Sequence, residues 1–213
     1  LSVKEWEAVI NLVCRATKKP VFAGILRESE KEVFALIQKA NKLLCVGVVV
    51  PTLYDTDEGN LKYLKQVVEI SNKKVLLYNT EEHPLKSVGT LKKIDLFSKI
   101  VAVKDSSMNL PFFTKFVALK KQDKLRMNIF QGMEHLLLQS AGCSGYVISL
   151  LNTEPKLCKT MFQKQDKATN DKILAKFWEQ NLGGNWYISL KAILYERGII
   201  RSAEEINLGV KPL

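Results

Sequence analysis

The regular alternation of short apolar runs with helical stretches is the feature that most constrains the fold of this chain. Six runs rich in β-branched residues begin roughly 20 to 30 residues apart, which is the spacing of strand–helix units. Each run is apolar throughout rather than at alternate positions, as is typical of parallel strands that are covered on both faces. The runs lie at 20–25, 45–50, 74–78, 99–104, 127–131 and 145–149, and helical patterns occupy 30–44, 58–71, 88–97, 110–121 and 133–141.

Two architectures fit this alternation, an open doubly wound sheet and most of a (β/α)8 barrel. No GxGxxG or P-loop pattern follows any run, which removes the commonest phosphate-binding reason for an open sheet. Polar or special residues instead end successive runs, as they do in a barrel, where the site is built from many strand ends. They are Pro51-Thr52, Tyr78-Asn79-Thr80, Lys104-Asp105-Ser106-Ser107, Gln131-Gly132 and Ser149. We therefore predict a TIM (β/α)8 barrel.

The predicted domain organisation follows from the number of runs. A TIM barrel has eight strands and about 250 residues, whereas only six runs are found here. Ser2 and Glu5 form an S-x-x-E capping box at the start of the first helical pattern. We expect the first two strands to precede this sequence. Residues 1–153 would then supply units three to eight, preceded by the helix of unit two, and 154–213 a C-terminal helical extension.

Composition excludes several classes of function. No window approaches 18 uninterrupted apolar residues, so a membrane-spanning helix is not expected. The net charge of +10 comes mostly from lysines spread over every helical pattern, with only five arginines, and nucleic-acid binding is not expected. The four cysteines have no CxxC spacing and there are two histidines. This pattern favours reduced thiols in a cytoplasmic protein without a metal site.

Lys104 is the principal candidate for chemistry. It ends the apolar run of KIVAVKDSS (99–107), and a buried lysine is unfavourable unless it is paired or deprotonated. Tyr78 ends the preceding run, and adjacent strands lie ~4.8 Å apart. A deprotonated amine can attack a keto carbon to form a Schiff base, and a nearby phenol can move the protons. A solvated lysine at a strand end is the simpler alternative.

Several motifs resemble those of the dihydrodipicolinate synthase / N-acetylneuraminate lyase family. They are LLYNT (76–80), IVAVKDSS (100–107), GCSGYVIS (142–149) and PTLYDTDEG (51–59), together with LSVKEWEAVI and WYISLKAILYERGI near the two ends. The resemblance covers essentially all 213 residues. It implies a class I aldolase on a TIM barrel that acts on pyruvate through a covalent lysine imine, without a cofactor. It also implies a homo-oligomer, either a dimer or a tetramer.

The same resemblance implies roles for individual residues. Lys104 would form the imine and Tyr78 would relay protons. Tyr54 would be a second relay residue, although its loop is shorter than the family pattern. Ser149 and Ile148 would line the keto-acid pocket.

One departure from the family pattern affects the expected substrate. His83 is a candidate substrate-binding residue, because it lies near the place where true synthases carry an arginine for the carboxylate of the second substrate, and the neighbouring Glu81 and Glu82 disfavour an anion there. The family's Gly-Thr-Thr-Gly turn, which binds the carboxylate of pyruvate, ends the second strand and is expected with that strand ahead of this sequence. We expect condensation of pyruvate with an aldehyde such as aspartate semialdehyde. Cleavage of a sugar-derived 2-keto acid, of N-acetylneuraminate or 2-keto-3-deoxygluconate type, and a non-catalytic family member are the alternatives.

Overall fold

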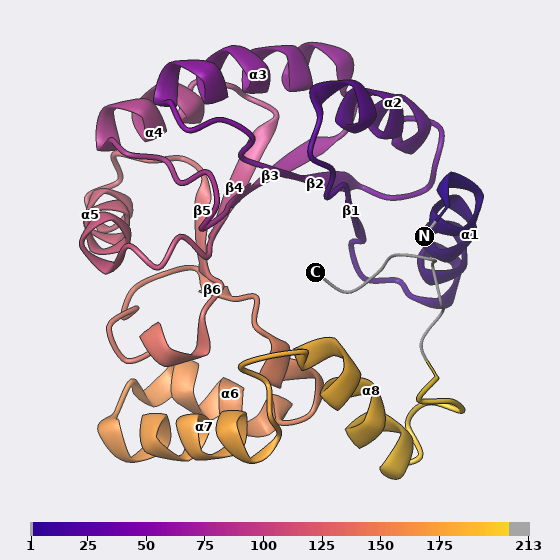
Figure 1. The fold of residues 1–213 in the computed structure, drawn as a ribbon. Helices are drawn as coiled ribbons and strands as arrows, with labels where there is room; N and C mark the ends of the chain where they lie inside the picture. Colours follow the sequence, from indigo (N-terminus) through magenta and orange to yellow (C-terminus); the bar gives the residue numbers. More distant parts are fainter. Residues whose placement is uncertain (1, 205–213) are drawn as a thin grey trace. The chain divides into compact units, whose positions relative to one another are not determined.

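The computed structural model describes residues 2–204 (Figure 1). The chain divides into two compact units, which are considered one at a time. The first consists of Leu1–Phe130 with Gly142–Ser144, and the second of Gln131–Ala141 with Gly145–Leu213. No helix among the described residues is long and apolar enough to cross a membrane.

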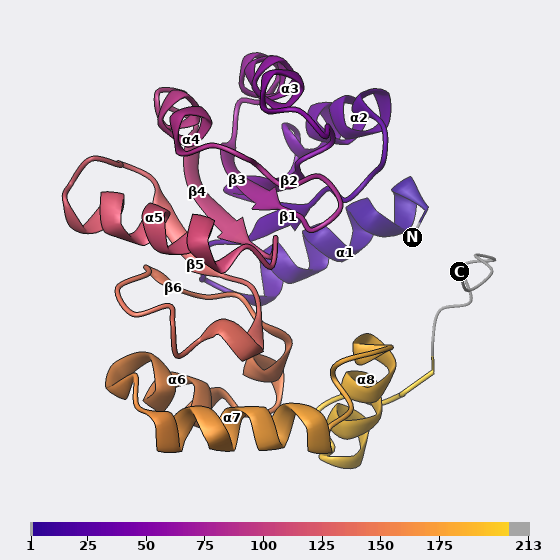
Figure 2. The same ribbon diagram turned by 60° about the vertical axis from the view of Figure 1, so that its left-hand side comes forward.

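The first unit contains a sheet whose neighbouring strands follow one another in the sequence. Its strands are β1 (Phe22–Gly24), β2 (Gly47–Pro51), β3 (Lys74–Asn79), β4 (Ile100–Asp105) and β5 (Asn128–Gln131), whose last residue belongs to the second unit. Strands β1 to β4 are parallel. The helices are α1 (Val3–Ala16), α2 (Glu30–Ala40), α3 (Asp57–Ile70), α4 (Val88–Asp95) and α5 (Leu110–Lys121). Figures 1 and 2 show α2 to α5 on one side of the strands, and the predicted strand–helix alternation is confirmed.

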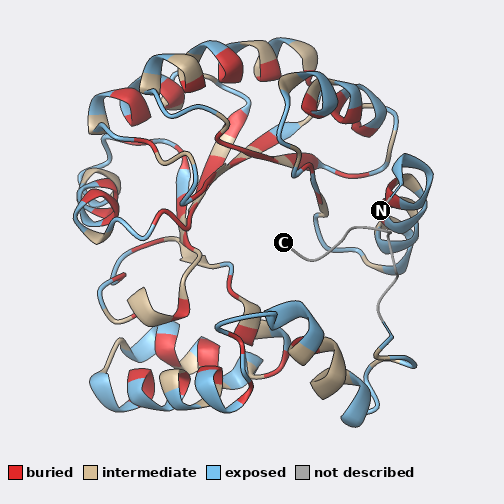
Figure 3. Cartoon of the chain, in the orientation of Figure 1, coloured by how far each residue is buried: buried red, intermediate tan, exposed pale blue. Residues whose placement is uncertain are grey.

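The helices of this unit begin where the sequence provides capping residues. The side chains of Ser29, Thr56, Ser87 and Asn109 each accept a hydrogen bond from a backbone N–H in the first turn of α2, α3, α4 and α5. Such caps satisfy N–H groups that have no partner within the helix. Each of these helices has several buried residues, and Figure 3 shows buried positions along the helices and the strands of this unit.

The capping box predicted for the first helix is confirmed. The backbone N–H of Glu5 donates to Ser2 Oγ at 3.3 Å and that of Ser2 donates to Glu5 Oε2 at 2.7 Å. Directly after Glu5, the indole of the buried Trp6 donates to the carbonyl of Gly24 at 2.8 Å. This bond fastens α1 to the end of β1.

One irregularity interrupts the pairing of β3 with β4. Val75 is aligned with Ile100, but the next residue, Leu76, is aligned with Ala102, so one residue of β4 is left over. Such an extra residue is a β-bulge, and it changes which face the following side chains occupy. Beyond the bulge, Tyr78 is aligned with Lys104.

The second unit is mostly helical. It contains β6 (Gly145–Tyr146), the 3-10 helices η1 (Glu134–Leu136) and η2 (Ser149–Asn152), and the α-helices α6 (Pro155–Lys164), α7 (Lys167–Glu179) and α8 (Trp186–Glu196). Its core is formed by buried apolar residues that include Leu150, Met161 and Ile173. Helices after residue 154 were predicted and are present in the described part. Residues 205–213 of the predicted extension lie outside the described residues, and the predicted boundary at 153 stays a prediction.

The helix predicted for 133–141 is wrong, because only the short turn η1 forms there. The Glu134 carboxylate is buried and accepts a hydrogen bond from Leu150 N at 3.1 Å. The Ser140 hydroxyl donates to the carbonyl of Leu136 at 2.6 Å and accepts from Gln131 Nε2 at 3.0 Å. Side-chain hydrogen bonds of this kind compete with the helical ladder. The strand predicted for 145–149 also stops early, at Tyr146.

Candidate active site

Lys104 and Tyr78 lie side by side at the carboxyl ends of β4 and β3. They are aligned in the register of the two strands, and Lys104 Nζ is 4.3 Å from the centroid of the Tyr78 ring. Both side chains are half-buried. The electron-rich ring face attracts a cation at this distance, so the ring favours this position of the amine when it is protonated. The two residues that the sequence singled out are therefore brought together.

The residues that follow this pair are buried and hydrogen-bonded to each other. Asn79 Nδ2 donates to Asp105 Oδ2 at 2.6 Å, and both side chains are almost inaccessible to solvent. Burial raises the pKa of Asp105, against the opposing effect of hydrogen bonds from Asn79 and Ser107. The ends of β3 and β4 thus carry two successive aligned pairs of residues. The first pair supplies the phenol and the amine, and the second supplies the amide and the carboxyl group.

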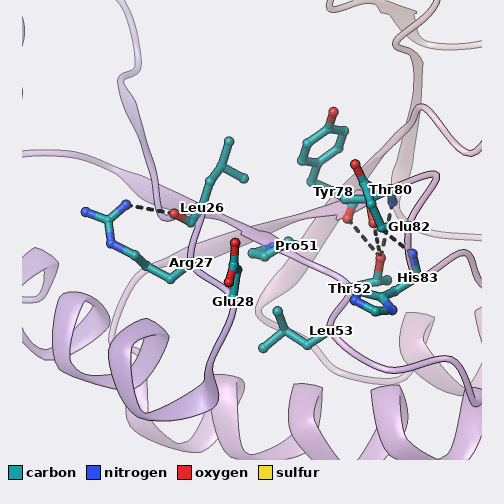
Figure 4. A pocket seen from close by; sticks show the side chains of 10 residues that line it. All are labelled: Leu26, Arg27, Glu28, Pro51, Thr52, Leu53, Tyr78, Thr80, Glu82 and His83. Carbon is teal, nitrogen blue, oxygen red and sulfur yellow. Dashed lines mark hydrogen bonds between the residues drawn. The ribbon is translucent and has the colours of Figure 1, made fainter. Parts of the chain in front are cut away.

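A pocket of about 420 Å³ adjoins the Tyr78 side of this arrangement (Figure 4). Ten residues from the carboxyl ends of β1, β2 and β3 and from the loops that follow them line it, and Figure 4 labels them all. Lys104 is not one of the lining residues, so Tyr78 connects the amine to the pocket. The pocket lies entirely within the first unit.

Two threonine hydroxyl groups are buried at the pocket wall. Thr52 Oγ1 and Thr80 Oγ1 are 3.2 Å apart, and the Thr80 backbone N–H also donates to Thr52 Oγ1 at 3.2 Å. The backbone N–H of Thr52 donates to the carbonyl of Tyr78 at 2.9 Å. These bonds tie the ends of β2 and β3 together and hold the backbone that carries the phenol.

His83 lines the pocket, but it already has an acidic partner. Its Nδ1 atom is 2.8 Å from Asp55 Oδ1, and its backbone N–H donates to Thr80 Oγ1 at 3.2 Å. The exposed carboxylates of Glu28 and Glu82 line the same pocket. The negative charge around this histidine disfavours an anionic group of a substrate.

Arg27 also lines the pocket. Its guanidinium donates to the neighbouring carbonyl of Leu26 at 2.7 Å. Figure 4 shows the side chain extending away from Tyr78 and Thr80. In this position Arg27 does not replace the arginine that the family pattern would place near His83.

Tyr54 lies away from the pocket lining. Its ring packs near that of Tyr63 in α3, with the centroids 6.3 Å apart. A hydrogen bond with Glu30 is the largest of the effects that raise the pKa of Tyr54. The structure therefore places this phenol beside α2 and α3, and its predicted role as a relay residue stays a prediction.

Ile148 and Ser149 belong to the second unit. Ile148 is buried at the N-cap of η2, and Ser149 is the half-buried first residue of that turn. Neither residue is in a strand, because β6 ends at Tyr146. Their predicted place in a keto-acid pocket is untested. In residues 2–204, no cluster of His, Cys, Asp or Glu side chains has the grouping needed to bind a metal ion.

Comparison with known proteins places the chain in a family. The model of the dihydrodipicolinate synthetase family matches residues 1–204. The chain belongs to this family. A 2-dehydro-3-deoxy-D-gluconate/2-dehydro-3-deoxy-phosphogluconate aldolase from Picrophilus torridus is 28% identical over 158 residues, which are 71% of this chain and 58% of that protein. A 4-hydroxy-tetrahydrodipicolinate synthase from Bradyrhizobium diazoefficiens is 29% identical over 164 residues, 72% of this chain and 54% of that protein.

Members of the dihydrodipicolinate synthetase family with solved structures share the fold. The synthase from Bacteroides thetaiotaomicron matches with a TM-score of 0.81 at 21% identity, over 98% of this chain and 76% of its own. The synthase from Acinetobacter baumannii, solved in complex with pyruvate, matches with a TM-score of 0.79 at 22% identity, over 100% and 77%. The fold is therefore TIM-barrel-like, as predicted. The chain spans only a little over half the length of the two curated relatives named above.

Sequence reasoning did not foresee the contacts of Asn79, Asp105 and Asp55. All three were visible as polar residues next to predicted strand ends. What the sequence lacked was the register of β3 against β4 and the path of the loops, which decide which of these side chains meet. The pairing of Asp55 with His83 joins loops 28 residues apart, and no local pattern signals it.

Proposed function

We propose that the protein is a pyruvate-dependent lyase or aldolase that forms a Schiff base through Lys104. The observation that carries this proposal is the position of Lys104 Nζ over the ring of Tyr78, at the carboxyl end of two parallel strands. Active sites of TIM barrels lie at this end of the strands. Family membership supports the reaction class.

The proposed first step uses only these two side chains and the substrate. The neutral amine of Lys104 attacks the keto carbon of a 2-keto acid and forms a C–N bond. The carbonyl oxygen leaves as water after it has received two protons, and both come in the end from the nitrogen of the amine. The phenol of Tyr78 gives one proton to the oxygen and takes one back from the nitrogen, so that an imine and an intact phenol remain.

In cleavage, the protonated imine accepts the electron pair of the C3–C4 bond of the 2-keto acid as the hydroxyl group on C4 loses its proton, which leaves an enamine and an aldehyde. In condensation, the imine first loses a proton from C3, and the resulting enamine supplies the electron pair for the new bond.

The residues that line the pocket support cleavage of a sugar-derived 2-keto acid rather than condensation of pyruvate with aspartate semialdehyde. Glu28 and Glu82 line the pocket, and His83 is engaged by Asp55. These groups disfavour a second carboxylate, whereas they can accept hydrogen bonds from the hydroxyl groups of an uncharged chain. The relative from Picrophilus torridus is named for an aldolase of this kind. We infer a 2-keto-3-deoxy sugar acid as the substrate class.

Four finer expectations about the whole protein are proposals as well. Six strands lie within the described residues, and a TIM barrel needs eight. We propose that sequence outside these 213 residues supplies the other two, that α6 to α8 form a helical extension, and that the protein acts as a homo-oligomer in the cytoplasm. Size-exclusion chromatography with light scattering measures the oligomeric state, and a monomeric mass would contradict that part of the proposal.

The decisive experiment traps the imine. The protein is incubated with pyruvate and sodium borohydride, digested and examined by peptide mass spectrometry, with Lys104→Arg as the control. We expect an adduct on Lys104 that the variant lacks. Absence of an adduct from the unaltered protein would favour the non-catalytic alternative.

A second experiment chooses the substrate. Pyruvate release is measured with 2-keto-3-deoxygluconate and with N-acetylneuraminate, and consumption of aspartate semialdehyde is measured in the presence of pyruvate. We expect turnover of the 2-keto-3-deoxy sugar acid. Preferential use of aspartate semialdehyde would overturn the assignment of the substrate class and leave the Schiff-base proposal intact.

A further inference from the structure

The alignment of Lys104 with Tyr78 depends on the register of β4 against β3. The bulge at the start of β4 places Ala102, rather than its predecessor, opposite Leu76. Without this extra residue, every later side chain of β4 would move by one position and face the other side of the sheet. Lys104 would then be aligned with Asn79 and would lie on the face opposite the phenol. A contact that forms only in the observed register would favour it over this alternative.

The buried pair Asn79 and Asp105 is placed to make this selection. The two residues are aligned with each other, one position after Tyr78 and Lys104. Asn79 Nδ2 donates to Asp105 Oδ2 at 2.6 Å, and the exposed fractions of the two residues are 0% and 1%. Next to them, the backbone N–H of Ser106 donates to the carbonyl of Asn79 at 2.9 Å. The side-chain bond can form only when these two positions are opposite each other.

The hydrogen bonds around the pair define its direction. Asn79 Oδ1 accepts from the Leu85 N–H at 2.8 Å, which fixes the amide so that its NH₂ group faces Asp105. Asp105 Oδ1 accepts from the N–H and the hydroxyl of Ser107, at 3.3 and 3.0 Å. The amide therefore donates and the carboxyl group accepts, and each side chain is held by its own loop.

Burying a carboxyl group is unfavourable, as the raised pKa of Asp105 reflects. Polar groups kept in a core despite such a penalty can select one arrangement among several. We propose that the Asn79–Asp105 hydrogen bond locks the register of β4 on β3, and that these two residues are thereby positioning residues for Lys104 and Tyr78. This inference rests on the proposed function for its catalytic consequence but not for its structural one.

The test exchanges the two partners. In Asn79→Asp combined with Asp105→Asn, the new aspartate can accept from both Leu85 N–H and the new amide, whose oxygen can accept from Ser107. All the hydrogen bonds of the native pair are thus available in reverse. Asn79→Ala and Asp105→Ala each break the bond, and Asp105→Leu keeps most of the side-chain volume without an acceptor if Asp105→Ala does not fold. Ser107→Ala is the matched control, because it removes a contact with Asp105 and leaves the bond between the strands.

Two measurements are made on each variant. Borohydride trapping with pyruvate gives the rate of adduct formation, and hydrogen–deuterium exchange gives the protection of the Ser106 amide. We expect the alanine variants to trap about 10 to 100 times more slowly at saturating pyruvate, with the half-saturating pyruvate concentration unchanged. Their Ser106 amide should exchange about tenfold faster or more, because a weakened lock exposes it. The exchanged double variant should recover both properties.

The two readouts separate the possible failures. If the unaltered protein forms no adduct, the proposed function fails, and amide exchange still decides whether the lock exists. The inference is overturned if the alanine variants keep native amide protection. It is also overturned if the double variant forms the adduct no faster, and protects the Ser106 amide no better, than the single alanine variants. The same holds if Ser107→Ala alone reproduces the effect of those variants.

Discussion

Lys104 Nζ lies 4.3 Å from the centroid of the Tyr78 ring, and the face of such a ring attracts a protonated amine. The ring and the hydroxyl can therefore have separate tasks. The ring would hold the amine in place, and the hydroxyl would carry the proton that the departing oxygen needs. A substitution that removes the hydroxyl group and keeps the ring distinguishes these two roles.

Tyr78→Phe removes the hydroxyl and keeps the ring. We expect turnover to fall by about 10²- to 10⁴-fold, the usual contribution of an acid–base group, while the free energy of unfolding changes by less than about 1 kcal/mol. Steady-state kinetics and thermal unfolding measure the two effects. Tyr187→Phe, at an exposed position of α8, is the control. Unchanged turnover in Tyr78→Phe would remove the phenol from the mechanism.

At the scale of single elements, β2 begins with a glycine because a neighbouring side chain occupies the space beside it. A Cβ atom on Gly47 would lie 2.3 Å from an atom of the Phe22 ring and 2.8 Å from the Lys74 carbonyl oxygen. A Cβ atom on Gly24, in the adjacent strand β1, would have no atom within 4 Å. The two glycines form a natural pair for comparison.

Gly47→Ala should destabilise the protein by about 1 to 3 kcal/mol, as is typical of overpacking. Gly24→Ala should change the free energy of unfolding by less than about 1 kcal/mol, because no atom lies in the way. Urea unfolding followed by circular dichroism measures both. Equal effects in the two variants would show that the crowding by Phe22 and Lys74 is relieved without loss of stability.

The carboxylate of Asp166 caps the N-terminus of α7. Asp166 accepts hydrogen bonds from the N–H and the hydroxyl of Thr169 at 2.7 and 3.0 Å, and these bonds lower the pKa of Asp166. A carboxylate whose folded pKa is lowered contributes stability above its unfolded pKa of about 3.9. That contribution is lost as the pH falls through the lower, folded value.

Asp166→Ala should therefore lower the melting temperature at pH 5 to 7, and the difference should shrink steadily below about pH 4. Thermal scans across this range provide the measurement. Asp171→Ala, which removes an exposed partner of Lys167, is the control for the loss of a surface charge. A difference that persists unchanged at pH 3 would contradict a cap that depends on ionised Asp166.

The sequence predicted elements well where local chemistry decides them. Continuous apolar runs indicated the strands, and the capping box of Ser2 and Glu5 marked the start of the first helix. The helix expected at 133–141 failed because Glu134 is drawn toward Leu150, a partner 16 residues away. The proximity of Lys104 and Tyr78 was predicted, but the bulge between them and the start of β4, on which their alignment depends, was not. A single extra residue in a strand leaves no compositional signal.

At the scale of the whole molecule, a covalent ligand should stabilise the folded chain. Pyruvate at about 100 times its dissociation constant should add roughly 2.7 kcal/mol to the free energy of unfolding, which corresponds to roughly 5 to 11 °C in melting temperature for a chain of this size. Differential scanning calorimetry measures the shift. Lactate, which lacks the keto group, and Lys104→Arg are the controls. A shift of equal size with lactate would indicate binding of the carboxylate without an imine.

The bond between Trp6 and Gly24 gives the protein an internal optical probe. Of the three tryptophans, Trp178 and Trp186 are 67% and 45% exposed, whereas Trp6 is 6% exposed. A water-soluble quencher such as iodide would quench the fluorescence of Trp178 and Trp186 and leave the emission of Trp6. Because its indole is bonded to the end of β1, two residues before Leu26 in the pocket lining, that residual fluorescence would report substrate arriving at the pocket without any added label.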